Sequence, residues 1–154
     1  MNKPKAVKGL PAVLFYLVQL TWGLPVNIIG FLVFLVCKLR KCPTEKYCNS
    51  FITYVKKKNF GGLSMGLFIF IRDEKEKKVW LHDTKIHEYG HTIQALVLGV
   101  FYWIIVGIPS AIWCNLFAGY RKKNNVSYYK LYCESWANNW GQKWSGEKQI
   151  ETRR

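Results

Sequence analysis

Acidic residues and histidines are scarce in this chain of 154 residues. Nine Asp and Glu stand against 23 Lys and Arg, which leaves a formal net charge of +14, and there are three His. A basic chain poor in aromatic residues would indicate a disordered polycation, but Phe, Trp and Tyr make up 16% of this sequence. The composition therefore excludes a disordered polycation and predicts one domain that is folded or membrane-bound.

Paired cysteines are also missing. The cysteines are odd in number and none belongs to a Cys-x-x-Cys pair: Cys37, Cys42, Cys48, Cys114 and Cys133. We expect reduced thiols in or facing a cytoplasm, with a disulfide or cysteine-bound zinc as the alternatives. No nucleic-acid-binding module is recognisable, and the lysines are spread around apolar segments, so no nucleic-acid partner is expected.

Two long stretches contain no Asp, Glu, Lys, Arg or His. Residues 10–37 form the first, of 28 residues, and residues 95–119 form the second, of 25 residues. About 20 apolar residues suffice to cross the hydrocarbon core of a bilayer. We therefore expect an integral membrane protein in which 10–37 and 95–119 are the membrane segments of a single domain, 1–154. The first stretch is too long for the apolar region of a cleavable signal peptide, so none is expected.

Each apolar stretch is interrupted near its middle. Gly23 and Pro25 interrupt the first, and Gly107 and Pro109 interrupt the second. Proline removes an intrahelical hydrogen bond and glycine loosens the adjacent turn. A kink or a reversal of the chain is therefore expected at both places.

The remaining sequence predicts further helices and a little β-structure, so the expected fold class is α+β and mostly helical. A basic linker is expected over 38–58, and a strand over 63–71, which is rich in β-branched and aromatic residues, with 79–81 pairing back as a hairpin. A helix is expected to begin near Lys85 and to continue into the second apolar stretch. The last helix is expected over about 127–143.

The pattern His-Glu-x-x-His occupies residues 87–91, just inside the helix expected from Lys85. Positions i and i+4 of a helix lie on one face, so His87 and His91 can reach one tetrahedral Zn²⁺, with Glu88 beside a water on the metal. His82 precedes the pattern and is expected in an exposed loop. The alternative interpretation is that these polar residues merely begin an apolar helix.

A zinc hydrolase requires a third protein ligand and an open position for water. Asp83 is too close in sequence to His87 to come round easily, and most other acidic residues lie in lysine-rich turns. Glu134, in the last expected helix, is the remaining candidate. Asn138 lies one turn further along the same helix face.

This combination resembles the gluzincin metallopeptidases, in which His-Glu-x-x-His is followed on a later helix by a ligand glutamate in an E-x-x-A-[D/N]-like run. The resemblance implies that Zn²⁺ is bound by His87, His91 and Glu134. It also implies that Glu88 is the general base and that Asn138 supports a ligand histidine from behind.

Among gluzincins, the membrane-embedded CAAX prenyl proteases and HtpX-like enzymes are the most similar, because there also the motif helix adjoins membrane segments that precede the glutamate. Those enzymes place two spanning helices between histidines and glutamate, whereas this chain has the single stretch 95–119. Their substrate class is therefore not carried over. The site-2 protease family is a weaker resemblance, since its third ligand is a transmembrane Asp and none occurs here.

Metal coordination also constrains topology. If 95–119 crossed a bilayer once, His91 and Glu134 would lie ~30 Å apart, whereas bonds to zinc are ~2 Å long. Either this stretch is a re-entrant hairpin that turns at 107–110, or Glu134 is not a ligand. Lys and Arg flank both ends of both stretches without the bias of single spans. We therefore expect two hairpins entering from the cytoplasmic face, with the polar parts cytoplasmic; ordinary spans are the alternative.

Together these patterns predict a zinc-dependent membrane metallopeptidase that hydrolyses a peptide or protein substrate, with 63–71 as the strand edge that binds the substrate. The candidate donors to the oxyanion are tyrosines: Tyr89, Tyr128, Tyr129 and Tyr132. The alternative is a non-enzymatic basic membrane protein that binds anionic lipid or a protein partner. The oligomeric state is left open.

Overall fold

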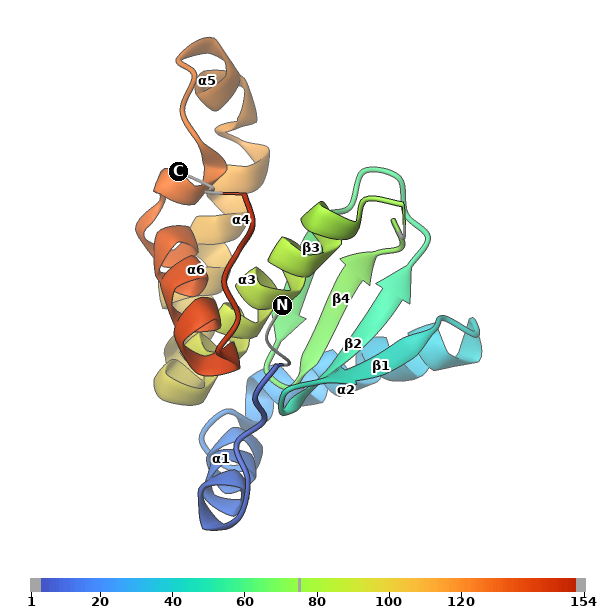
Figure 1. The fold of residues 1–154 in the computed structure, drawn as a ribbon. Helices are drawn as coiled ribbons and strands as arrows, with labels where there is room; N and C mark the ends of the chain where they lie inside the picture. The colour runs from blue at the N-terminus through green and yellow to red at the C-terminus, as the bar shows by residue number, and fades with distance from the viewer. Residues whose placement is uncertain (1–3, 75, 152–154) are drawn as a thin grey trace.

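A small β-sheet lies between helices in the computed structural model, which describes residues 4–74 and 76–151 (Figure 1). The sequence also predicts a short basic arm over 1–9 and a charged turn over 72–78, and both fall partly outside the described residues. In chain order the elements are α1 (Leu10–Leu20), α2 (Leu24–Leu39), β1 (Thr44–Tyr47), β2 (Ser50–Val55), β3 (Gly62–Met65), β4 (Phe68–Arg72), α3 (Lys78–Leu98), the 3₁₀ turn η1 (Gly99–Phe101), the π-helical η2 (Trp103–Gly107), α4 (Ile108–Asn115), α5 (Ala118–Lys123), the 3₁₀ turn η3 (Tyr128–Lys130) and α6 (Tyr132–Ser145). The expected mixture of many helices and a small sheet is confirmed.

The four described strands are arranged in the order β1-β2-β4-β3. The β1–β2 and β3–β4 pairs are antiparallel, whereas β2 and β4 are parallel. Because β4 lies between β2 and β3, β3 forms one edge of the sheet. The edge strand is thus much shorter than the run 63–71.

The single strand expected over 63–71 is wrong, because the chain reverses at Gly66 and Leu67. Gly66 has a φ of +64°, a left-handed conformation that suits glycine. Asn27 of α2 stabilises this turn by accepting a hydrogen bond from the Leu67 backbone N–H over 2.8 Å. The contact joins residues 40 positions apart in sequence, so local strand propensity could not reveal it.

Two other expectations for this region are also wrong. The basic linker expected over 38–58 contains β1 and β2, which are held by pairing with each other and with β4. The run 79–81, expected to pair as a strand, lies in the first turn of α3, which begins at Lys78 rather than near Lys85. Trp80 and Leu81 pack against the main core from this helical turn. Tertiary burial overrides their strand propensity.

Helix α3 covers one face of the sheet. Its buried Tyr89 and Ile93 pack with Ile52, Ile69 and Ile71 of the two central strands. The aromatic rings of Phe31 and Phe34 on α2 contact Phe51 and Phe68 of β2 and β4. The sheet therefore holds α3 in place by burial of apolar surface.

Helix α6 lies alongside α3 (Figure 1). A Cβ atom at Gly90 would lie 1.9 Å from the carbonyl oxygen of Ala137, and one at Gly141 would lie 1.9 Å from that of Ile86. Only glycine permits the two backbones to approach so closely. The helix expected over 127–143 is divided between η3 and α6, with Leu131 extended between them.

Both apolar stretches are broken, as expected. The first bends by 87° between α1 and α2, at the predicted place. The second bends by 119° between the helical stretches 78–101 and 103–115, not at 107–110. Gly99, at φ +53°, ends α3 against the Trp22 ring, whereas Pro109 lies inside continuous helical backbone, where η2 runs directly into α4.

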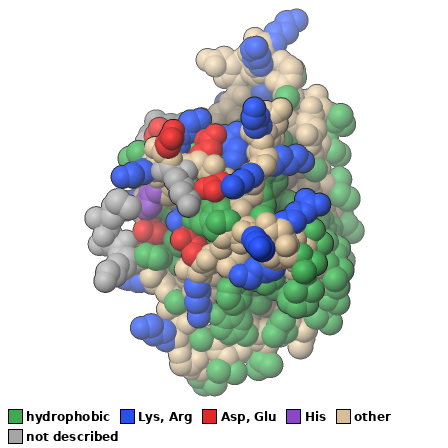
Figure 2. All heavy atoms as spheres, turned by 90° about the vertical axis from the view of Figure 1, so that its right-hand side faces the viewer, with side chains coloured by type: hydrophobic (Ala, Val, Ile, Leu, Met, Phe, Trp, Pro, Cys, Tyr) green, Lys and Arg blue, Asp and Glu red, His purple; other side chains and the backbone are tan. Residues whose placement is uncertain are grey.

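No single helix among the described residues is both long enough and apolar enough to cross a bilayer, although each of the two bent pairs meets these criteria when its halves are combined. Many apolar side chains of both stretches are exposed, for example Leu10, Leu14, Leu17, Leu32, Ile104 and Leu116. Figure 2 shows hydrophobic side chains gathered over the lower part of the face that it presents, with Lys and Arg mostly above them.

Candidate metal centre

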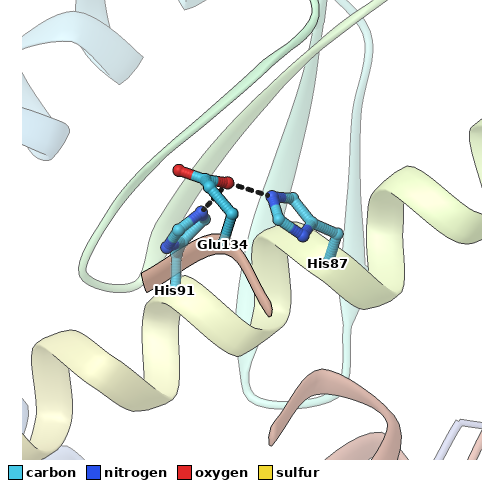
Figure 3. Close-up of side chains that lie close together, drawn as sticks. All are labelled: His87, His91 and Glu134. Atoms are coloured by element: carbon cyan, nitrogen blue, oxygen red, sulfur yellow. Dashed lines mark ion pairs between the residues drawn. The ribbon is translucent and has the colours of Figure 1, made fainter. Parts of the chain in front are cut away.

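The two histidines of the 87–91 motif and a glutamate from α6 meet at one point (Figure 3). Oε2 of Glu134 lies 3.1 Å from Nε2 of His87 and 3.4 Å from Nε2 of His91. The ligand atoms of the three residues all lie within 4.8 Å of one another, and the three residues are buried. The structure thus brings together the three residues that the sequence analysis selected as ligands, from segments more than 40 positions apart.

His91 is oriented by a glutamine that the sequence analysis did not select. Its Nδ1 lies 2.7 Å from Oε1 of Gln94, and Nε2 of Gln94 donates to the Cys133 carbonyl oxygen over 2.8 Å. A carbonyl only accepts, so this bond sets the orientation of the glutamine amide. Oε1 then accepts a hydrogen bond from Nδ1–H, which leaves Nε2 as the ligand atom of His91.

His87 is oriented in the same way by Asn138. Its Nδ1 lies 2.8 Å from Oδ1 of Asn138, one helical turn after Glu134 on α6. Nδ1 donates to this oxygen, and Nε2 is left facing Glu134. This is the position that the sequence analysis expected for Asn138. Support of the outer nitrogen by such an acceptor is typical of metal-binding histidines.

The convergence of these groups calls for a positive charge between them. Two imidazole lone pairs and a carboxylate oxygen meet in a buried place, and Oε2 of Glu134 has no other hydrogen-bond partner among the described residues. Burial favours the neutral acid, but the imidazoles of His91 and His87 outweigh burial and hold the pKa of Glu134 below its usual range. Burial lowers the pKa of His91, but the Glu134 carboxylate reverses this and raises it to about 9. Either a proton on His91 or a metal ion supplies the missing charge.

Glu88 lies beside this cluster, between α3 and β3. The Ser64 hydroxyl is 3.0 Å from Oε2 of Glu88, and a Cβ atom at Gly62 would lie 2.1 Å from Oε1. Burial raises the pKa of Glu88 above its usual value, although the neighbouring imidazoles act in the opposite direction. The carboxylate is therefore held in place by β3.

The cluster opens into a cavity of about 650 Å³ between β3 and the helices of the second apolar stretch. His87, Glu88 and His91 line its floor together with Gly62 and Ser64 of the edge strand. On the opposite side the cavity is lined by residues of η2, α4 and η3, namely Trp103, Val106, Ser110, Ala111 and Tyr128. The cavity therefore extends from the edge strand of the sheet to the cluster.

The backbone of β3 presents hydrogen-bonding groups to this cavity. Arg72 donates to the Gly61 carbonyl oxygen over 3.0 Å, and hydrogen-bonded pairs alternate along an antiparallel ladder. The N–H and C=O groups of Gly62 and Ser64 therefore point away from β4. The Tyr102 hydroxyl, which donates to the Ser64 carbonyl oxygen over 3.3 Å, lies on that open side.

The four tyrosines named as candidate donors to the oxyanion differ in whether they line the cavity. Tyr89 projects from α3 into the main core, and the exposed Tyr132 donates a hydrogen bond to the Ile105 carbonyl oxygen. Neither residue lines the cavity. Tyr128 and Tyr129 do line it. The Tyr128 hydroxyl lies 3.0 Å from that of Ser110.

Three residues of the site were missed from the sequence: Ser64, Gln94 and Tyr102. Gln94 carried a signal, because it lies three residues after His91 and so on the same helix face. Ser64 and Tyr102 carried none, since their partners lie 24 and 38 residues away. All five cysteines are free thiols.

No protein-family model matches the chain, and searches of curated proteins and of solved structures find no similar protein.

Proposed function

We propose that this chain is a zinc-dependent metallopeptidase of the gluzincin type that acts at a membrane. The observation that carries the proposal is the buried convergence of His87, His91 and Glu134 beside Glu88, on the floor of a cavity that an edge strand lines. A structural role for the cluster does not account for its opening toward a cavity.

The donor set suits Zn²⁺. Two imidazole nitrogens and one carboxylate oxygen are the protein ligands of many catalytic zinc sites, which keep a further position for water. Held by His87, His91 and Glu134, Zn²⁺ supplies Lewis acidity, which lowers the pKa of a water and polarises a carbonyl group. The acceptors behind both histidines, Asn138 and Gln94, accept hydrogen bonds from the Nδ1 atoms and so make Nε2 the metal-binding nitrogen of each ring.

The chain's own groups then divide the work of hydrolysis. Glu88 takes a proton from the attacking water and passes it to the leaving amine, and its raised pKa favours the first of these transfers. Ser64 and Gly62 hold its carboxylate toward the cavity. The open edge of β3 binds the substrate as an added strand through the N–H and C=O groups of Gly62 and the N–H group of Ser64, whose carbonyl oxygen already accepts from Tyr102.

We further propose that the two broken apolar stretches lie in the membrane and that the polar parts remain on its cytoplasmic side. Exposed apolar side chains cover α1, α2 and the helices from η1 to α4, far more than isolated surface residues require. Basic residues flank both stretches and suit a surface of anionic lipid. A non-enzymatic membrane protein would share these features but has no use for the cluster at 87–91 and 134.

The test is metal content and peptidase activity measured side by side, with protein purified in detergent. We expect one zinc per chain in the wild type, measured by mass spectrometry of the metal, and cleavage of an unstructured protein such as casein that a chelator abolishes. Glu134→Ala should lose zinc, whereas Glu45→Gln, a control at an exposed glutamate in β1, should keep it. Wild-type protein that binds no zinc after metal repletion would refute the peptidase proposal. The alternative, a non-enzymatic basic membrane protein, would then remain.

A further inference from the structure

The C-terminal segment packs against the metal centre on the side of Asn138, away from the cavity. After α6 the chain reverses at Gly146 and runs back along α3 and α6, as the last red segment of Figure 1 shows. We call residues 146–151 the strap. Its backbone and side chains contact both helices of the site, although none of its residues lines the cavity.

The strap is held at both ends by buried acids. Asp83 of α3 is fully buried, and its two carboxylate oxygens accept the backbone N–H groups of Ile150 (2.8 Å) and Glu151 (2.9 Å). At the other end, the buried Glu147 carboxylate accepts a hydrogen bond from the Tyr47 hydroxyl over 2.6 Å.

His82 adds a further contact near the middle of the strap. It was expected in an exposed loop, but it lies in α3 and donates to the Lys148 carbonyl oxygen over 3.0 Å. A surface tail without a role does not require a fully buried aspartate, so the attachment indicates that the position of the strap matters.

Gln149 reaches from the strap to the residue behind His87. Its Nε2 donates to the Asp83 carbonyl oxygen over 3.2 Å and to Oδ1 of Asn138 over 2.9 Å. The Asp83 carbonyl only accepts, so it determines which end of the Gln149 amide faces the site. The donor end of Gln149 in turn selects the oxygen end of the Asn138 amide.

The orientation of Asn138 decides which nitrogen of His87 carries the proton. With its oxygen toward His87, Asn138 accepts from Nδ1–H and leaves the lone pair on Nε2, which faces Glu134. With the amide turned over, its NH₂ group would donate to Nδ1 and the proton would move to Nε2, which then cannot bind a metal. With the amide turned over, the NH₂ group of Asn138 would also face the NH₂ group of Gln149, and two donors cannot form a hydrogen bond with each other.

We infer that the strap sets the tautomer of His87 and thereby the affinity of the site for zinc, with Gln149 as the positioning residue and Asp83 as its anchor. The inference rests on the proposed metal site. A segment that begins 55 residues after the motif thus helps to prepare one of its ligands.

The first experiment compares the zinc affinity of single variants by competition with a chelator, on the full chain. Gln149→Ala removes the donor that orients Asn138 and should weaken zinc binding about 10- to 100-fold, the effect of losing a partner behind a ligand histidine. Lys148→Ala truncates an exposed neighbour on the same strap and should bind zinc as the wild type does. Wild-type affinity in Gln149→Ala would overturn the inference but leave the metal site intact.

The second experiment separates orientation from simple loss of structure. A carboxylate has an oxygen at either end, so Asn138→Asp needs no partner to accept from Nδ1 of His87. Gln149→Ala should therefore cost little zinc affinity when it is added to Asn138→Asp. An equal loss in both backgrounds would mean that Gln149 only stabilises the fold.

The tautomer can be read without any metal. ¹⁵N chemical shifts of His87 are measured at alkaline pH in the metal-free Glu134→Ala variant, which removes the carboxylate oxygen that lies 3.1 Å from Nε2 and competes for the proton. They should show the proton on Nδ1 in this background and a population with the proton on Nε2 when Gln149→Ala is added. This measurement keeps the two proposals apart. A wild type that binds no zinc would refute the peptidase, whereas an unchanged tautomer in the variant would refute the role of the strap.

Discussion

The hydroxyl of Ser64 on β3 lies within hydrogen-bonding distance of both oxygen-bearing groups of Glu88 on α3, at 3.0 Å from Oε2 and 2.6 Å from the main-chain carbonyl oxygen. The proposed general base is thus attached to the strand along which the substrate is proposed to bind. Changes in β3 should therefore affect the chemistry without removing the metal.

Gly62→Ala should lower peptidase activity about 10- to 100-fold with zinc retained, because an added Cβ atom would lie 2.1 Å from Oε1 of Glu88 and displace the carboxylate. Gly61→Ala is the matched control. It also lines the cavity, but nothing lies within 4 Å of an added Cβ atom there. Activity and zinc content measured on the two variants test the prediction; equal activities would show that Gly62 does not position the base.

Glu88→Gln should abolish turnover while leaving the metal in place. The amide keeps the shape of the side chain but cannot accept a proton from water, so a loss of about 10²- to 10⁴-fold is expected. Zinc content should remain at one per chain, since Glu88 is not among the three converging ligands. Unchanged cleavage by this variant would exclude the proposed mechanism.

Gly141→Ala should destabilise the fold and loosen the site together. A Cβ atom there would lie 1.9 Å from the Ile86 carbonyl oxygen, so α6, which carries Glu134, must move away from α3. Overpacking of this kind costs about 1–3 kcal/mol, measurable by chemical unfolding in detergent. Gly119→Ala, in the open space of α5, is the control and should leave stability unchanged or slightly raised.

Zinc binding at neutral pH should release about one proton. Glu134 raises the pKa of His91 to about 9 in the metal-free protein, so at pH 7.5 the imidazole is protonated and must lose this proton to bind the metal. Zinc affinity should consequently rise as pH increases toward about 9 and then level off. Calorimetry in buffers of different ionisation enthalpy measures the protons released. No release at pH 7.5 would mean that His91 is neutral before the metal arrives.

The proposed membrane topology predicts that three exposed positions lie on the same side of the membrane. Cysteines introduced at Lys8, Lys46 and Lys123 should all react with an impermeant maleimide in inside-out vesicles and be protected in intact cells. Cys42 and Cys114 should first be replaced by serine, because the other three native thiols are buried. Labelling of the three positions from different sides would contradict the pair of re-entrant hairpins.

The local part of the site could be predicted from the sequence, and the distant part only in outline. The spacing of His87 and His91 follows from helical periodicity, which is local and therefore readable from sequence. The selection of Glu134 depended on a pattern and on elimination. The sequence held no information on the close approach of α3 and α6 that brings this carboxylate to the histidines.

The same distinction explains the errors in the fold. The strand content of 38–58 was missed because β1 and β2 are stabilised by pairing and burial rather than by an alternating pattern of their own. The turn at Gly66 depends on Asn27, and the bend of the second apolar stretch depends on Gly99 packing against Trp22. Each of these contacts joins segments that are distant in sequence.

By itself, the sequence determined the class of the fold, the two broken apolar stretches and the face of the helix that carries His87, Glu88 and His91. These properties depend on composition and on periodicities within one segment. Only the tertiary structure decided that Glu134 meets both histidines, that β3 is the open edge and that the strap reaches Asn138. Those relationships depend on burial and hydrogen bonds between distant segments, whose free energy no local pattern contains.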